Sequence, residues 1–116
     1  MFNFEKLDVW HKGIAFADSI YTLTRDFPPD ERFGLTNQMR RAAVSVPSNI
    51  AEGSSRMSQT DYSRFIEIGT GSLYEVVTQS FIAKKQNFLA AENFSLIYRD
   101  AEELSRMLSG LRRSLK

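Results

Sequence analysis

The chain contains no cysteine, so its 116 residues cannot form a disulfide, a thiolate nucleophile, a cysteine-ligated zinc site or an iron–sulfur cluster. Histidine is nearly absent as well, because His11 is the single one. Its acidic neighbours at helical spacing, Glu5 and Asp8, give one nitrogen and two carboxylates, and solvation at a helix end is the expected role of the imidazole. No serine stands in a turn signature that would complete a nucleophilic triad with this histidine. We therefore predict no metal, no cofactor and no enzymatic activity.

Long hydrophobic runs are also missing, and no stretch approaches the roughly 20 apolar residues that span a bilayer. The N-terminal residues carry acids early and lack the basic-then-apolar order of a secretory signal. An apolar fraction of 42% and a charged fraction of 25% are typical of a soluble globular protein. The sequence predicts one cytoplasmic domain over residues 1–116, without a membrane partner.

Period-two alternation is absent, whereas apolar residues recur every three or four positions through most of the chain. This spacing predicts a first helix from Glu5 to Phe27, ended by two prolines, and a second from Leu35 to Gly53. A third helix begins after the cap Ser58 and continues to about Lys85, and a fourth opens near Glu92. Four helices joined by short loops predict an all-α, up-down-up-down antiparallel four-helix bundle.

The first helix carries two apolar seams, where a helix packed on one core needs only one. The first seam comprises Leu7, Trp10, Ile14, Ala17, Tyr21 and Thr24, and the second comprises Gly13, Phe16, Ile20, Leu23 and Phe27. Burial on two sides indicates self-association. Phe81 and Phe88, near the end of the third helix, are further candidates for an intersubunit contact.

Proline is scarce, yet Pro47 stands inside the helical pattern of the second helix, where it removes the hydrogen bond to the Ala43 carbonyl. We therefore predict a kinked helix that Gly53 and the small polar residues after it terminate. A polar stripe follows the same helix, and the residues of this motif with a predicted structural role are Gln38, Arg41, Ser45, Pro47, Asn49, Glu52 and Gly53.

Two interpretations of the stripe remain open. Arg41 and Glu52 could contact a ligand or RNA, or they could form an interhelical or intersubunit ion pair. In the second interpretation, the polar side chains of Gln38, Ser45, Ser48 and Asn49 satisfy carbonyls that Pro47 leaves free.

Charge is segregated along the chain although the net charge is only +1. Residues 104–116 carry Arg106, Arg112, Arg113 and Lys116 and no acid. A set of cations could bind phosphate groups of RNA or DNA, or could be an ordinary solvated surface: Arg40, Arg56, Arg64, Lys84, Lys85, Arg112 and Arg113.

Four parts of the sequence carry one resemblance: LTNQMRRAAVSVPSNIAEGSSR from Leu35 to Arg56, Phe65, GSLYE at 71–75 and the opening LDVWHKG at 7–13. In these parts the chain resembles the family of 23S rRNA intervening-sequence proteins. The resemblance implies a four-helix bundle that assembles into a homopentamer and has no attached enzymatic activity. The chain is also similar to the accessory protein of diversity-generating retroelements, a basic pentamer that works with a reverse transcriptase and its RNA.

These patterns lead to two hypotheses. The first is a non-enzymatic homo-oligomeric scaffold, most simply a pentamer, that presents repeated surfaces to a protein or RNA partner. The alternative is an RNA- or DNA-binding accessory factor that works with a nucleic-acid enzyme such as a reverse transcriptase.

Overall fold

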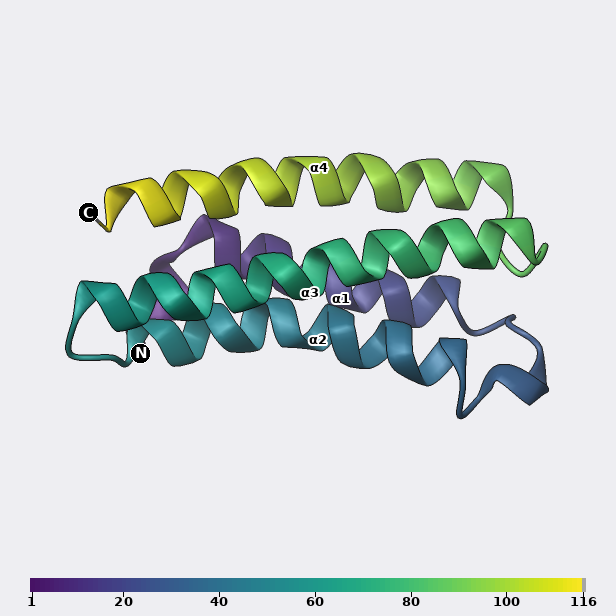
Figure 1. The fold of residues 1–116 in the computed structure, drawn as a ribbon, viewed down its shortest axis with the longest axis horizontal. Coiled ribbons are helices and arrows are strands. Elements are labelled where there is room, and N and C mark those ends of the chain that lie inside the picture. Colours follow the sequence, from purple (N-terminus) through teal and green to yellow (C-terminus); the bar gives the residue numbers. More distant parts are fainter. Residues whose placement is uncertain (116) are drawn as a thin grey trace.

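The structure is a computed structural model that describes residues 1–115, and these residues form an antiparallel bundle of four helices without a strand. The helices are α1 (Asp8–Leu23), α2 (Leu35–Ser54), α3 (Gln59–Lys85) and α4 (Ala91–Ser114), with short 3-10 turns at Asn3–Lys6 and Pro29–Glu31. Successive helices run up and down, so both ends of the chain lie at the same end of the bundle (Figure 1). The predicted all-α fold and the number of helices are confirmed.

Each helix packs on two neighbours, with the α2–α3 contact the most extensive of the four pairs and the α1–α4 contact the least. The core between them is built by the apolar seams of all four helices. Its fully buried large side chains are Ile20, Met39, Val46, Ile50, Ile66, Leu73, Val76, Leu104 and Leu108.

Helix α1 is shorter at both ends than the predicted Glu5–Phe27. At its start, Leu7 is extended and separates the helix from the 3-10 turn before it. At its end, the Thr24 hydroxyl donates to the Ile20 carbonyl over 2.7 Å, and the chain then folds back so that Phe27 is buried against Phe88. The prediction extended the helix because Phe27 continues the apolar spacing, but this ring reaches the core from the loop.

Helix α2 continues through Pro47, as predicted, and ends at Ser54. The pyrrolidine ring is buried and faces Gly13 of α1, where a Cβ atom would lie 3.3 Å from the Cβ atom of Pro47. The absent side chain of Gly13 therefore makes room for the proline. A bend of the helix axis at Pro47 stays a prediction.

The predicted end of α2 is correct within one residue, because the helix ends at Ser54 among the small polar residues, but Gly53 itself lies inside the helix and has no left-handed backbone. Its small size serves a close helix contact instead. A Cβ atom there would lie 2.9 Å from Phe65 Cβ and 2.9 Å from Tyr62 Cδ1, both in α3. Burial at this contact raises the pKa of the Tyr62 phenol above its ordinary value.

The turn from α3 to α4 contains the one non-glycine residue among 1–115 with a positive φ, Asn87 at 62°. Its N–H bonds to the Lys84 carbonyl, and the N–H of Phe88 bonds to the Ala83 carbonyl over 2.9 Å. These two bonds are those of a Schellman motif, in which asparagine tolerates the left-handed conformation better than most residues.

The start of α3 is as predicted, since the N–H of Asp61 donates to the Ser58 hydroxyl.

Candidate functional site

The sequence motif on α2 divides into a buried half and an exposed half. Pro47 and Gly53 are buried and Ser45 and Asn49 half-buried against the neighbouring helices. The members that lie on the solvent side of the helix are Gln38, Arg41, Ser48 and Glu52. The motif therefore combines a packing function with an exposed surface.

The inner half joins α2 to α3 through a small polar cluster. The Asn49 side-chain amide donates to the carbonyl of Ser45 over 2.8 Å and to its hydroxyl over 2.9 Å. The Ser45 hydroxyl also lies 2.8 Å from the hydroxyl of Ser72 in α3, beside the close approach of Gly69 to Asn49. The amide thus bonds the Ser45 carbonyl, and not the Ala43 carbonyl that Pro47 leaves free.

The outer half of the motif carries two side chains of opposite charge. Arg41 and Glu52 are exposed, and neither forms an ion pair within residues 1–115. Exposed residues of opposite charge stand at matching heights on α3. Because the Ser45–Ser72 contact fixes the antiparallel register, Glu75 lies near the level of Arg41, and Arg64 near the level of Glu52.

Two large apolar side chains are exposed on α3 beside these charges, Ile68 at 50% and Ile82 at 49%. We refer to this surface as the outer α2–α3 face, which comprises Gln38, Arg41, Ser48, Glu52, Arg64, Ile68, Glu75 and Ile82.

The structure does not gather the seven cations with predicted nucleic-acid contacts into one surface. Arg40, Lys84 and Lys85 lie toward the end of the bundle where α3 ends, and the other four toward the end that holds both termini (Figure 1). The longest dimension of the bundle is 43 Å.

Arg40 is engaged inside its own chain at the end of α1. Its Nε atom donates to the Thr24 hydroxyl over 2.9 Å and its terminal nitrogen to the Tyr21 carbonyl over 3.3 Å, while the guanidinium lies over the Tyr21 ring. A cation that satisfies carbonyls at a helix C-terminus also stabilises the helix dipole. Arg40 therefore stabilises the helix end.

Three more of the seven cations have partners. Arg56 lies over the Phe65 ring, Lys84 lies over the Phe94 ring, and Arg112 donates to Glu67 over 3.0 Å. The remaining ones, Arg64, Lys85 and Arg113, are exposed and form no ion pair within residues 1–115.

A cavity that the sequence interpretation missed lies between α3 and α4. It has a volume of about 410 Å³, with an apolar floor of Leu73, Val77 and Ala101. Its other lining residues are Tyr74, Thr78, Tyr98, Glu102, Ser105 and Arg106. We refer to it as the α3–α4 groove. One available sequence signal was the seven-residue spacing of Arg99, Arg106 and Arg113, which places these arginines on one face of α4.

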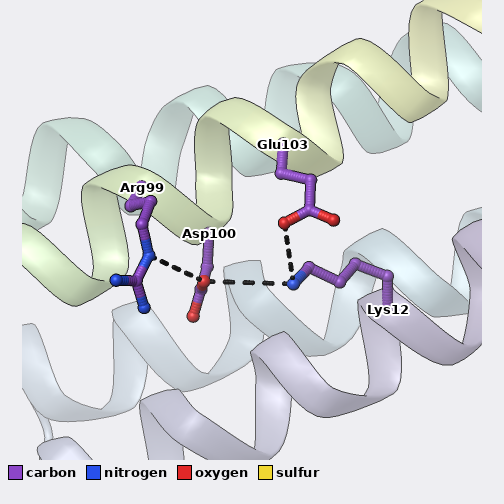
Figure 2. A network of polar contacts seen from close by, with 4 residues as sticks. All are labelled: Lys12, Arg99, Asp100 and Glu103. Carbon is purple, nitrogen blue, oxygen red and sulfur yellow. Dashed lines mark ion pairs between the residues drawn. The ribbon is translucent and has the colours of Figure 1, made fainter.

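An ionic network joins α1 to α4 (Figure 2). The Lys12 ammonium lies 3.2 Å from a Glu103 oxygen and 3.9 Å from an Asp100 oxygen, and Arg99 approaches Asp100 to 3.8 Å. The side chains of Lys12 and Asp100 are each 28% exposed, so water screens the pair only in part. The network closes the least extensive helix contact of the bundle.

His11 lies at the start of α1, where its Nε2 atom is 2.7 Å from the Glu5 carbonyl. Since a carbonyl only accepts, Nε2 carries the hydrogen. Nowhere in residues 1–115 do three histidine or acidic side chains gather as a possible metal site. The described helices include none that is long and apolar enough to cross a membrane.

Comparisons with known proteins agree with this geometry. A family model described as 23S rRNA-intervening sequence protein matches residues 5–110. A solved structure of a protein with unknown function from the S23 ribosomal protein family of Bacteroides thetaiotaomicron superposes with a TM-score of 0.83 and 21% sequence identity, over 90% of this chain and 95% of that one. At this identity the likeness shows the fold. A search of curated proteins found no match.

Proposed function

The chain belongs to the 23S rRNA-intervening sequence protein family, and from this premise we propose that it is a non-enzymatic scaffold that acts as a homo-oligomer. The observation that carries the proposal is the outer α2–α3 face, where exposed charges of both signs and exposed isoleucines lie together. The pentamer implied by the sequence resemblance is the form we propose.

The charge of this face favours a second copy of the chain as its partner. Arg41 and Arg64 balance Glu52 and Glu75, so the face has no excess charge that would attract a strongly charged partner. Each of the two levels of the face, that of Arg41 with Glu75 and that of Glu52 with Arg64, carries one charge of each sign. In a ring of copies that share one orientation, the α2 side of this face in one copy can meet the α3 side in the next copy, which places Glu75 against Arg41 and Arg64 against Glu52.

The apolar residues of the face support the same partner. Ile68 and Ile82 are about half exposed, and burying such side chains is the main driving force for association. The doubled seam predicted for α1 supplies a separate exposed apolar surface, outside the outer α2–α3 face. Its second seam lies in the core through Phe16 and Ile20, whereas Ile14 and Tyr21 of the first seam are exposed.

Light scattering and sedimentation of the purified protein at micromolar concentration test the proposal. We expect a mass several times that of the 13.3 kDa chain. Arg41→Glu should lower this mass, because it places like charges together, and Glu52→Arg or Glu75→Arg should do the same. A second reversal should restore the mass if it falls on the acid that meets Arg41. The two double variants that identify this acid are Arg41→Glu with Glu52→Arg and Arg41→Glu with Glu75→Arg.

The matched control is Arg25→Glu, which reverses an exposed charge outside this face and should leave the mass unchanged. A wild-type mass of 13.3 kDa would contradict assembly itself. An assembled wild type whose mass ignores all the reversals at Arg41, Glu52 and Glu75 would instead contradict the use of this face.

A further inference from the structure

We propose that the α3–α4 groove binds single-stranded nucleic acid, with bases stacked on its tyrosines and phosphates held by the arginines of α4. This site goes beyond the assembly proposed above and does not use the outer α2–α3 face. Of the seven cations predicted from the sequence, only Arg113 takes part.

Stacking surfaces are the first requirement, and the groove has two exposed rings. Tyr74 of α3 is 62% exposed and Tyr98 of α4 is 41% exposed, and both border the cavity. Phe81 packs edge-on against Tyr98, with ring centroids 6.2 Å apart, and so supports its orientation. Every base offers a π-face, so such rings bind single strands, whereas a duplex keeps its base faces covered.

The size of the cavity suits this ligand. Its volume of about 410 Å³ falls within the roughly 300–1,000 Å³ of typical ligand sites. The floor of Leu73, Val77 and Ala101 is apolar, as expected beneath a stacked ring, and Thr78 and Ser105 also line the cavity.

Positive charge at the groove comes from Arg106, and two further arginines share its face of α4. Arg99, Arg106 and Arg113 are all exposed, and their seven-residue spacing places them along one face of α4 at intervals of about 10 Å. A stacked strand rises about 3.4 Å per nucleotide, so successive arginines would meet roughly every third phosphate. Arg99 is 70% exposed but lies 3.8 Å from Asp100, in the network that joins α4 to α1, so Arg106 is the arginine that lines the groove itself.

Glu102 is the only carboxylate that lines the groove, and it determines where a phosphate cannot lie. A carboxylate accepts hydrogen bonds from exocyclic amino groups, cytosine among them. It therefore favours a base edge at this point and disfavours bases without an amino group, such as uracil and thymine.

Fluorescence anisotropy with short labelled oligonucleotides tests the site on the full chain at low salt. The probes are single-stranded RNA and DNA of matched sequence, a cytidine-rich strand, a uridine-only strand and a duplex. We expect single strands to bind more tightly than the duplex, with affinity that falls as salt rises. Comparison of RNA with DNA shows whether the ribose hydroxyl contributes.

Variants then locate the ligand. Tyr74→Ala with Tyr98→Ala should weaken binding by about tenfold or more, because each stacked base contributes roughly 1–3 kcal/mol. Tyr98→Phe keeps the ring and should bind like the wild type. Arg106→Glu should weaken binding by about tenfold and flatten the salt dependence, and Glu102→Gln should reduce the preference for cytidine over uridine.

Two controls match these changes outside the groove: Arg25→Glu for charge and Phe33→Ala for an exposed aromatic ring, which is 83% exposed. Circular dichroism and light scattering test whether each groove variant keeps the fold and the mass of the wild type. Absent binding, salt-insensitive binding, equal affinity for the duplex, or loss in the controls equal to that in the groove variants would each overturn the proposal. A groove variant that loses oligonucleotide binding but keeps the wild-type mass would show that the groove and the outer α2–α3 face act separately.

Discussion

At the scale of single residues, the surroundings of each cation decide whether it is available to a partner. Arg40 satisfies the end of α1, and Arg112 pairs with Glu67, 45 residues away in sequence. Arg106 has neither kind of partner within residues 1–115 and instead lines a cavity. The sequence composition does not distinguish these arginines. Their contacts do, because Arg40 and Arg112 stabilise the fold whereas Arg106 is available to a partner.

Asn87 provides the first prediction at this scale. Replacement by alanine should lower the free energy of unfolding by about 1 kcal/mol, because an ordinary L residue is strained at a φ of 62°. Replacement by glycine should leave stability unchanged or raise it by a few tenths of a kcal/mol. Urea unfolding at one fixed protein concentration measures both, and equal stability of the two variants would contradict the Schellman assignment.

At the scale of helices, glycine marks where two backbones approach. Gly53→Ala should destabilise the bundle by about 1 kcal/mol or more, because the new Cβ would lie 2.9 Å from Phe65 Cβ and this atom cannot move without its backbone. Gly110→Ala is the matched control. Its nearest neighbour is the tip of Arg113 at 4.0 Å, so higher helix propensity should stabilise by about 0.5–1 kcal/mol. The midpoint of thermal unfolding should fall for Gly53→Ala and rise for Gly110→Ala. A shift in the same direction for both variants would contradict the close contact at Gly53.

The helices themselves were predictable because their apolar period is a local property. The starts of α3 and α4 were also predictable within a residue, from the cap Ser58 and the seam that opens near Glu92. The end of α1 was not, since Thr24 and Arg40 meet there from positions 16 residues apart. Phe27 misled the prediction because a loop residue can bury itself as deeply as a helical one.

The candidate surfaces were predictable only in part. The stripe of α2 shows in the sequence because its members share one helix. The α3–α4 groove does not, because Tyr74 and Tyr98 come from different helices and one sequence does not report how closely those helices pack. The Arg99–Arg106–Arg113 spacing was visible, yet it gained meaning only once the neighbouring rings were placed.

At the scale of the whole molecule, stability should be uneven around the bundle. The α1–α4 contact is the least extensive, and a second cavity of about 240 Å³ lies in it. Hydrogen exchange should therefore show the core amides of α2 and α3 protected longest, with α1 and α4 exchanging about tenfold faster or more. Uniform protection across the four helices would contradict this order.

The placement of both chain ends at one end of the bundle has a consequence for protein engineering (Figure 1). A short linker can join the end of α4 to the start of α1 without crossing the core. New ends can then be opened in the loop at Met57, whose side chain is fully exposed, to give the helix order α3, α4, α1, α2. In such a permuted chain the α1–α4 contact becomes a contact between sequence neighbours, and its pairing no longer requires closure of nearly the whole polypeptide.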